Sequence, residues 1–337
     1  MNINISSIKK SAAILCASTV ISSVLAACGI GGGSASQNTE AAQSPDTPEK
    51  ISIVTTIFPP YDFAKQLSGD LADVTMLVGP GEEIHTYEPT PQDILRIQNA
   101  DIFIYAGGES ESWVNGILGS FDSSSIETID MMELCEVVEE EIVEGMEAEE
   151  SDSKETGSAN EKEYDEHVWT SIDNSQIISQ AIADALCEAD EEHESVYREN
   201  CISYLAELSS LKKEIGQTVN GASRKTLIFG DRFPVRYFTE EFGLDYYAAF
   251  PGCAEQTEPS AGTVAFLINK TRDENIPVVF YIEMSNGKVA QTIAESTGAK
   301  TLCFNSCHNV TMEQFKNGVT YIDLMKQNAE SLKEALY

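Results

Sequence analysis

One of the four histidines in this chain, His85, stands on a loop between two predicted elements. The apolar run Val74–Val78 before it predicts a buried strand. After it, Thr90, Pro91 and Asp93 predict a helix start, because they combine an N-cap, a first-turn proline and a capping acid. Ligands bind at the carboxyl ends of strands in open α/β sheets, and an imidazole held there suits a metal ion. A solvated surface histidine is the competing interpretation.

Four short segments with histidine or aspartate follow one another along the chain: Gly81–Asp93, Asp165–Trp169, Asp231–Phe233 and Cys307–Asn309. The first reads Gly-Glu-Glu-Ile-His-Thr-Tyr-Glu-Pro-Thr-Pro-Gln-Asp. It resembles the first metal-ligand loop of the zinc and manganese solute-binding lipoproteins that serve ABC importers. The other three segments fall in the order that this family has, and the resemblance runs from about residue 50 to the C-terminus.

The resemblance implies a metal site built from His85 and His167 of one lobe and from Asp231 and His308 of the other. Three imidazoles and one carboxylate suit zinc, whereas a site richer in oxygen would suit manganese, the alternative cargo. Many family members have histidine where Asp231 stands and aspartate where His308 stands. The second-lobe ligands therefore stay open, and Glu283 is the substitute candidate unless it only bonds nearby backbone.

Other residues near these segments have weaker claims. His193 begins a helix within a run of acids and is interpreted as solvated. Tyr87, Glu88 and Trp169 are close enough in sequence to fix the tautomers of ligating imidazoles, or they are ordinary packing residues.

The folded part is predicted to be α/β, with two lobes that each contain a mostly parallel sheet flanked by helices. About 285 residues remain after residue 50, which suggests two lobes rather than one core. The first lobe is assigned to residues 51–190. Its strands are expected at Ile51–Thr56, Val74–Val78 and Ile102–Ala106, and its helices at Tyr61–Leu67 and Thr90–Asn99.

Two further helices are predicted, one at the end of the first lobe and one after it. Asp173–Glu188 is predicted as one, and Glu192–Thr218 as a second, longer one. Apolar residues in the longer segment recur every three or four positions, which indicates one buried stripe: Tyr197, Cys201, Tyr204, Leu208, Leu211 and Ile215. At ~1.5 Å per residue it would be roughly 40 Å long. The resembling family has such a backbone helix joining its lobes, here assigned to 191–220.

The second lobe, residues 221–337, repeats the alternation of strands and helices. Asp231 is expected just past the end of a strand, and His308 in the loop after the last strand. The predicted strands are Thr226–Gly230, Leu244–Phe250, Ile276–Ile282 and Lys300–Phe304, and the predicted helices include Val235–Phe242 and Thr320–Leu336.

The N-terminus predicts export and lipid attachment. Lys9 and Lys10 precede an apolar run, Ala12–Ala27, which is typical of a signal peptide. Cys28 directly after Leu-Ala-Ala forms a lipobox, so residues 1–28 are a lipoprotein signal and lipid on Cys28 would anchor the chain outside the cell membrane. An ordinary cleavage site with an incidental cysteine is the alternative. Residues 29–50 form a flexible tether.

Charge excludes one class of partner. The chain has 55 acidic and 21 basic residues, a formal net charge of −34. Such a charge opposes binding to nucleic acid. The insertion 136–166 is acidic and poor in large apolar residues, so we expect it to be mobile, either as a plain solvated loop or as a low-affinity attractor of cations.

Six cysteines lie beyond Cys28, and an even number in an exported chain permits disulfides. Some relatives in the resembling family have a disulfide in the second lobe, which here implies Cys253–Cys307. Cys187 and Cys201 form a second candidate pair. Zinc ligation by Cys307 is the rival interpretation, but no CxxC pair supports it.

The resemblance implies a zinc receptor, lipid-anchored and extracytoplasmic, that is not an enzyme and delivers its metal to the permease and ATPase of an ABC importer. We expect it to be a monomer. The competing classes are an exported metallohydrolase and a surface adhesin. A hydrolase needs an open metal position for water, and the chain has no HExxH helix.

Overall fold

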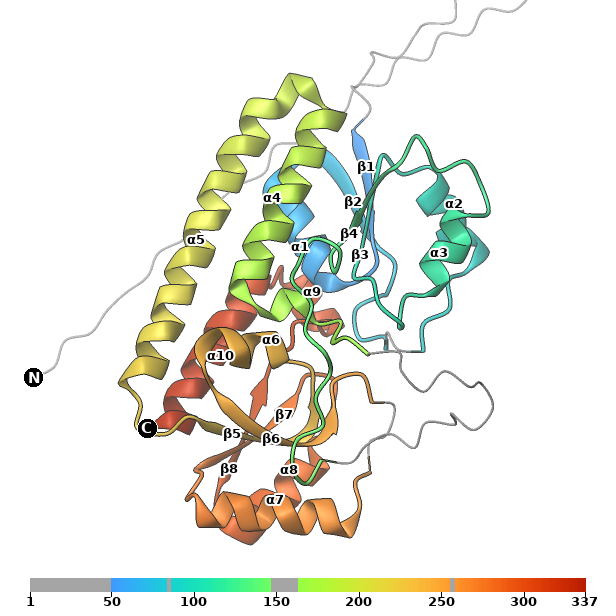
Figure 1. The fold of residues 1–337 in the computed structure, drawn as a ribbon. Coiled ribbons are helices and arrows are strands. Elements are labelled where there is room, and N and C mark those ends of the chain that lie inside the picture. Colours follow the sequence, from blue (N-terminus) through green and yellow to red (C-terminus); the bar gives the residue numbers. More distant parts are fainter. Residues whose placement is uncertain (1–49, 84–85, 147–162, 255–257) are drawn as a thin grey trace, which may run out of the picture. The chain divides into compact units, whose positions relative to one another are not determined.

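The computed structural model describes residues 50–83, 86–146, 163–254 and 258–337. They belong to one compact unit, Pro48–Tyr337. This unit contains two four-stranded parallel sheets with helices packed against them (Figure 1). The predicted fold class is confirmed. His85, Cys28, the export signal and nearly all of the tether lie outside the described residues.

The first sheet has the strand order β2-β1-β3-β4, in which every neighbouring pair is parallel. Its crossover segments contain the helices that the sequence predicts, and α2 begins with the expected capping box of Thr90 and Asp93. The helix α3 and the strand β4 were not predicted. The elements are β1 (Ile51–Thr55), α1 (Phe58–Ser68), β2 (Ala72–Met76), α2 (Pro91–Gln98), β3 (Ile102–Tyr105), α3 (Trp113–Leu118) and β4 (Glu127–Asp130).

The second sheet repeats this plan with the order β6-β5-β7-β8. Gly230 allows α8 to pack closely on β5, since a Cβ there would lie 2.5 Å from the Ala290 backbone. Of the helices in this lobe, α8 and α9 were not predicted. The elements are β5 (Thr226–Phe233), α6 (Arg236–Phe242), β6 (Asp245–Pro251), α7 (Ala261–Asp273), β7 (Val278–Ile282), α8 (Lys288–Thr297), β8 (Lys300–Phe304), α9 (Met312–Lys316) and α10 (Tyr321–Leu336).

The first lobe ends with η1 (Val168–Thr170) and α4 (Ile172–Ala189), after which η2 (Glu191–His193) and the long helix α5 (Glu194–Gly221) lead to the second lobe. All six residues of the predicted stripe on α5 are buried. Helix α5 contacts α1 and α4 of the first lobe and also α6 and α10 of the second (Figure 1). One hydrophobic core therefore continues from lobe to lobe. In the described part of the chain, no helix is long and apolar enough to cross a membrane.

Tyr321, the first residue of α10, joins the lobes by polar and aromatic contacts. Its backbone N–H donates to Asp62 Oδ2 of α1 at 2.8 Å, and its hydroxyl donates to the Trp169 carbonyl at 2.7 Å. Its ring meets Phe63 edge-on at 5.0 Å. Because Tyr321 is fully buried, these bonds satisfy polar groups that water does not reach.

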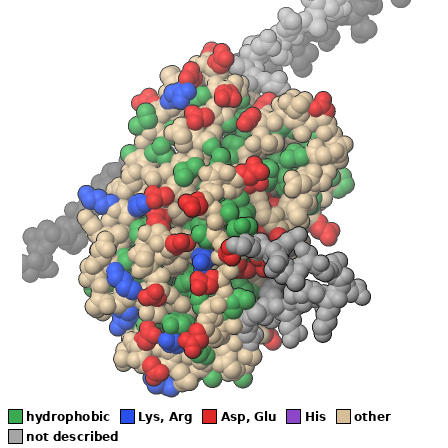
Figure 2. Space-filling model, viewed as in Figure 1, with side chains coloured by type: hydrophobic (Ala, Val, Ile, Leu, Met, Phe, Trp, Pro, Cys, Tyr) green, Lys and Arg blue, Asp and Glu red, His purple; other side chains and the backbone are tan. Residues whose placement is uncertain are grey.

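The described flanks of the acidic insertion differ from the expectation of a mobile loop. Met146 is buried, and Val138 packs against the main core. The Val138 N–H donates to the hydroxyl of Tyr237, which itself donates to the Asp165 carbonyl at 2.7 Å. Apolar residues spaced among the acids thus tie the flanks to α6, while residues 147–162 lie outside the description. Elsewhere acidic side chains are spread over the visible face without forming a single patch (Figure 2).

The predicted disulfide between Cys253 and Cys307 is not formed, since both are free thiols. Cys307 is fully buried in the core, where its sulfur lies 3.9 Å from the Asn305 carbonyl oxygen and close to Glu283. Cys253 lies instead among a different group of acids that includes Glu140. The two thiols therefore occupy separate surroundings.

Cys187 and Cys201 are also free thiols. The sulfur of Cys187 faces the Glu194 carbonyl at 3.8 Å, whereas that of Cys201 faces Gln180 at 3.7 Å. The two sulfurs thus have different partners and are not bonded to each other.

The buried carboxyl of Asp62 makes stability depend on pH. Burial raises its pKa from 3.8 to about 6, although bonds from Gln66 and from the Tyr321 N–H oppose the shift. The folded state therefore holds this proton more tightly than the unfolded chain. The contribution to stability is most favourable below about pH 4 and is lost as pH rises through about 6.

We predict that Asp62→Asn leaves the free energy of unfolding nearly unchanged at pH 4 and raises it at pH 7, by at most about 3 kcal/mol. The amide keeps an acceptor for Tyr321 and removes the buried charge. Urea unfolding at both pH values measures the effect. Asp101→Asn, at an exposed carboxylate that accepts from Ser52 N–H, is the control and should show no comparable gain. An equal effect of Asp62→Asn at both pH values would contradict the prediction.

Candidate metal centre

His167 lies at the start of η1 and is only 1% exposed. Asp165 holds it twice, because its Oδ1 accepts from the His167 backbone N–H at 2.8 Å and lies 3.1 Å from Nδ1 of the ring. In the neutral imidazole this contact places the proton on Nδ1 and the lone pair on Nε2. Burial opposes a charge on the ring, but the carboxylates of Asp165, Glu166 and Glu140 outweigh it and raise the pKa of His167.

His308 lies in the loop after β8, and Glu283 at the end of β7 shapes this loop. The Glu283 carboxylate accepts from the Ser306 N–H at 2.7 Å, from the Ser306 hydroxyl at 2.6 Å and from the His308 N–H at 3.0 Å. Burial raises the pKa of Glu283, although these bonds favour its ionised form. Cys307 has a φ of 62°, a conformation that is strained for a residue with a side chain.

The two imidazoles, which come from different lobes, meet in the structure. The ring centroids of His167 and His308 lie 5.3 Å apart with the rings nearly perpendicular. Trp169 packs against both, at 5.4 and 5.1 Å, and its Nε1–H donates to the Ser306 carbonyl at 2.9 Å. The indole thus fixes the distance between the two rings.

Asp231 does not follow the end of its strand as predicted, because β5 continues to Phe233. The pairing of β5 with β6 is irregular between Phe229 and Arg232, so Asp231 lies within this irregularity. Its carboxylate accepts from the backbone N–H of Arg232 at 2.9 Å and of Ile282 at 3.4 Å. Burial raises its pKa. In this geometry the Asp231 carboxylate hydrogen-bonds to the last residue of β7.

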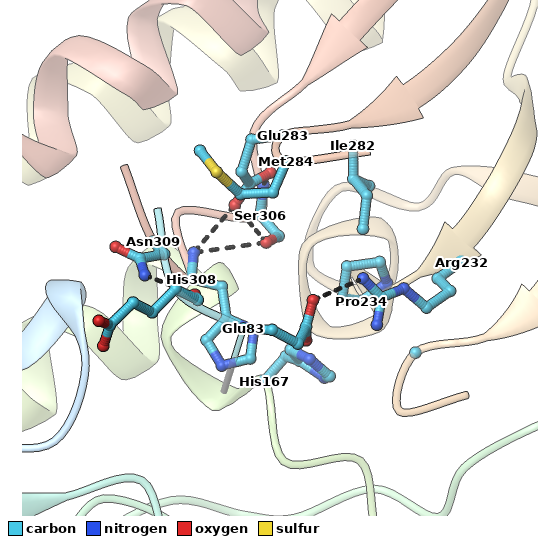
Figure 3. A pocket seen from close by; sticks show the side chains of 12 residues that line it. Glu83, His167, Arg232, Pro234, Ile282, Glu283, Met284, Ser306, His308 and Asn309 are labelled. Atoms are coloured by element: carbon cyan, nitrogen blue, oxygen red, sulfur yellow. Dashed lines mark hydrogen bonds and ion pairs between the residues drawn. The ribbon is translucent and has the colours of Figure 1, made fainter. Parts of the chain in front are cut away.

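A small cavity of about 30 Å³ lies beside the two imidazoles (Figure 3). It has the volume of about one water molecule or small ion. Asp231 is not among the residues that line it, whereas Arg232, directly after it, is. The polar lining side chains include those of Glu82, Glu83, His167, Arg232, Glu283 and His308.

The described residues do not complete a metal site in this geometry. Within 50–83, 86–146, 163–254 and 258–337, no three histidine, cysteine, aspartate or glutamate side chains are grouped closely enough to hold a metal. His167 and His308 supply two nitrogen donors of the kind that zinc binds. A full site needs further donors from outside these ranges or the movement of a carboxylate.

Asn309 joins the His308 loop to the predicted ligand loop of the first lobe, a role that the sequence analysis missed. Its Nδ2 donates to the carbonyl oxygens of Gly79 and Glu82, both at 2.9 Å. Asn309 is 8% exposed, and its Oδ1 accepts from the Val310 N–H. A sequence signal existed, since an asparagine directly after a candidate ligand is a donor well placed to fix a loop.

Of the residues considered for orienting the imidazoles, Trp169 can be judged against the rings of His167 and His308, whereas the relation of Tyr87 and Glu88 to His85 lies outside the described residues. Trp169 contacts both rings, but Glu88 is exposed and the Tyr87 hydroxyl donates to Asp93 at 3.0 Å. Asp165, which sequence reasoning passed over, is the acceptor beside the His167 ring. His193 was expected to be solvated. Its Nδ1 instead lies 2.6 Å from Asp190 Oδ2.

Comparison with known proteins supplies the family context. The family model described as zinc-uptake complex component A, periplasmic, matches residues 53–335. The zinc-binding lipoprotein AdcA of Streptococcus pneumoniae is 30% identical over 289 residues, which is 85% of this chain and 56% of that protein. The high-affinity zinc uptake system protein ZnuA of Bacillus subtilis is 30% identical over 313 residues, covering 93% of this chain and 96% of that one.

Among solved structures, the Zn(II)-bound ZnuA-like domain of Streptococcus pneumoniae AdcA matches with a TM-score of 0.70 at 28% identity. The match covers 86% of this chain and 99% of that domain. The present chain thus spans about half the length of AdcA (56%) and nearly all of ZnuA (96%).

We predict that Asn309→Ala loosens the loop at residues 79–83. The substitution removes two hydrogen bonds, each worth about 0.5–1.5 kcal/mol, although the Gly79 carbonyl still accepts from the Glu82 N–H at 3.0 Å. Hydrogen exchange should accelerate in residues 79–83 and 305–309, and urea unfolding should show the lower stability. Asn286→Ala is the control, because that exposed side chain only accepts from Lys288 N–H. Unchanged hydrogen exchange in both segments would show that the Asn309 hydrogen bonds do not hold the loop in place.

Proposed function

This chain belongs to the family of zinc-uptake complex component A, periplasmic, and from that membership we propose that it captures a zinc ion between its two lobes and delivers it to an ABC importer. Membership confirms the resemblance drawn from the four motif segments. The observation that carries the proposal is the meeting of His167 and His308, from different lobes, at one small cavity.

The donors favour zinc as the cargo. Neutral imidazole nitrogen is a preferred zinc ligand, and the Asp165 contact prepares the His167 ring to offer Nε2. We propose His85, His167 and His308 as ligands, with Asp231 as the fourth. Asp231 would have to give up its hydrogen bond with the Ser285 side chain and its long bond from Ile282 N–H to reach the cavity. Manganese remains the alternative cargo, since it favours oxygen donors.

Glu283 is the alternative carboxylate ligand. It already lines the cavity, but its oxygens accept three short hydrogen bonds from Ser306 and His308. Ligation by Glu283 would compete with the bonds that shape the His308 loop. This competition supports Asp231 as the ligand and Glu283 as the residue that positions His308.

The setting of the receptor completes the proposal. The relatives named lipoprotein and zinc uptake system protein support work outside the cytoplasmic membrane. We propose that lipid on Cys28 anchors the chain there, that a permease and its ATPase receive the metal, and that the receptor is a monomer.

We predict that His167→Ala and His308→Ala each weaken zinc binding by more than roughly 100-fold. Loss of a residue that only hydrogen-bonds to a ligand costs roughly 10–100-fold, and loss of the ligand itself should cost more. Each variant removes an imidazole nitrogen ligand from the lining of the cavity. Competition calorimetry with zinc and manganese, on metal-stripped protein checked by elemental analysis, measures this. His193→Ala removes an imidazole paired with Asp190 away from the cavity and serves as the control. Wild-type affinity in either ligand variant would refute the proposed site.

The same assay separates the two carboxylates. Asp231→Asn should weaken zinc binding if Asp231 ligates, whereas Glu283→Gln should then act mainly through the loop and accelerate hydrogen exchange at residues 305–309. A loss of affinity confined to Glu283→Gln, with exchange unchanged, would assign ligation to Glu283.

Lipid attachment has its own test. We predict that Cys28→Ala moves the protein from the membrane fraction to the soluble exported fraction and abolishes labelling by a radioactive fatty acid. Lipid on a single cysteine is the proposed anchor, so no other substitution should be needed. Cys16→Ala, within the apolar run of the signal, is the control. Membrane retention of Cys28→Ala would show that another feature holds the chain.

A further inference from the structure

Arg232 places a permanent positive charge at the cavity where the metal is proposed to bind. The irregularity in β5 turns Asp231 towards the β7 end, and the next side chain, Arg232, lines the cavity together with His167 and His308. Figure 3 shows its guanidinium directed towards Glu83, beside the His167 ring. The site thus contains a cation of its own.

The Arg232 side chain is only 13% exposed, yet its guanidinium makes only long contacts. Its Nη2 lies 3.6 Å from Glu83 Oε2, and its Nη1 donates to the Ala254 carbonyl at 3.4 Å. Within the described part of the chain, its Nε is buried without a hydrogen-bond partner. Arginine has five N–H donors, and buried arginines normally satisfy them.

The partners of Arg232 are weak enough to exchange. Glu83 is 45% exposed, and ion pairs with one exposed partner contribute little to stability. Arg236, four residues on, differs: it pairs closely with Glu141 and also contacts the Tyr246 hydroxyl, although its Nε too is buried without a partner. Arg236 is held as a structural residue, whereas the Arg232 guanidinium has little to keep it in place.

We propose that Arg232 is a built-in competing cation that sets the metal affinity of the site. In the structure its guanidinium borders the cavity and pairs with Glu83. A divalent ion between the imidazoles repels it, and the repulsion is strong because the surroundings are partly buried. Binding therefore turns the side chain away, and its return favours release. The inference rests on the proposed function, since it needs a metal at His167 and His308.

The lining of the cavity supports this role over a purely structural one. Apolar side chains of Pro234, Ile282 and Met284 border the cavity, which lowers the local dielectric constant and strengthens interactions between charges. The cavity of about 30 Å³ also leaves little room for a bulky anion that would neutralise the guanidinium beside a bound metal.

The test compares the full receptor with Arg232→Gln, Arg232→Met and Arg232→Lys. Both neutral variants should bind zinc at least about tenfold more tightly than wild type and transfer it more slowly to excess EDTA, because a unit charge beside a divalent ion is removed. Arg232→Lys keeps the charge and should stay near the wild-type affinity. Competition with a chromophoric chelator gives the affinity, and stopped-flow mixing gives the release rate.

Arg236→Gln is the matched control, since it removes one positive charge from the same lobe but away from the cavity. It should leave zinc affinity unchanged. Circular dichroism and thermal unfolding establish that each variant is folded, and Arg232→Met provides a second neutral side chain if Arg232→Gln is not.

Equal or weaker zinc binding by a folded neutral variant would overturn the inference and leave the proposed function intact. Tightening by Arg236→Gln as large as that by Arg232→Gln would also overturn it, because the effect would then be one of net charge. Failure of the wild type to bind zinc or manganese would overturn the proposed function and this inference together.

Discussion

The fixed conformation of the loop that carries His308 is the constraint on which the rest of the site depends. Three side chains hold it from different sides: the Glu283 carboxylate accepts from its N–H groups, the Trp169 indole donates to the Ser306 carbonyl, and the Asn309 amide reaches across to the first lobe. These bonds offset the strain at Cys307, whose φ is positive. Because Trp169 also packs on His167, the loop and the partner imidazole are positioned by the same residue.

Much of the fold could be predicted from the sequence because its signals are local. The capping box at Thr90 and the apolar stripe on α5 depend only on spacing within one helix, and both occur as predicted. The conformation around Asp231 depends instead on how β5 pairs with β6, which no local pattern encodes. The Cys253–Cys307 disulfide, which the resemblance implied, is not formed, because a pairing that some relatives have does not by itself bring these two thiols together.

For the site, sequence reasoning brought His167 and His308 together but assigned the surrounding polar residues poorly. Asp165, Asn309 and Arg232 were within the quoted segments and received no role. Each acts through contacts across large sequence separations or through the geometry of one loop, such as the bonds from Asn309 to Gly79 and Glu82. The type of a residue predicts what it can donate or accept, whereas its partner is decided by tertiary packing.

The architecture constrains how such a receptor can bind tightly and still release its cargo. Helix α5 contacts both lobes and the hydrophobic core continues between them, so wide separation of the lobes would expose buried apolar surface. Binding and release are therefore best controlled by short loops and single side chains. Two imidazoles packed on one indole lose little freedom when a metal arrives, which favours capture. Preorganisation alone would hold the ion too firmly for delivery, and a cation of the receptor's own beside the same cavity is a local way to counter it.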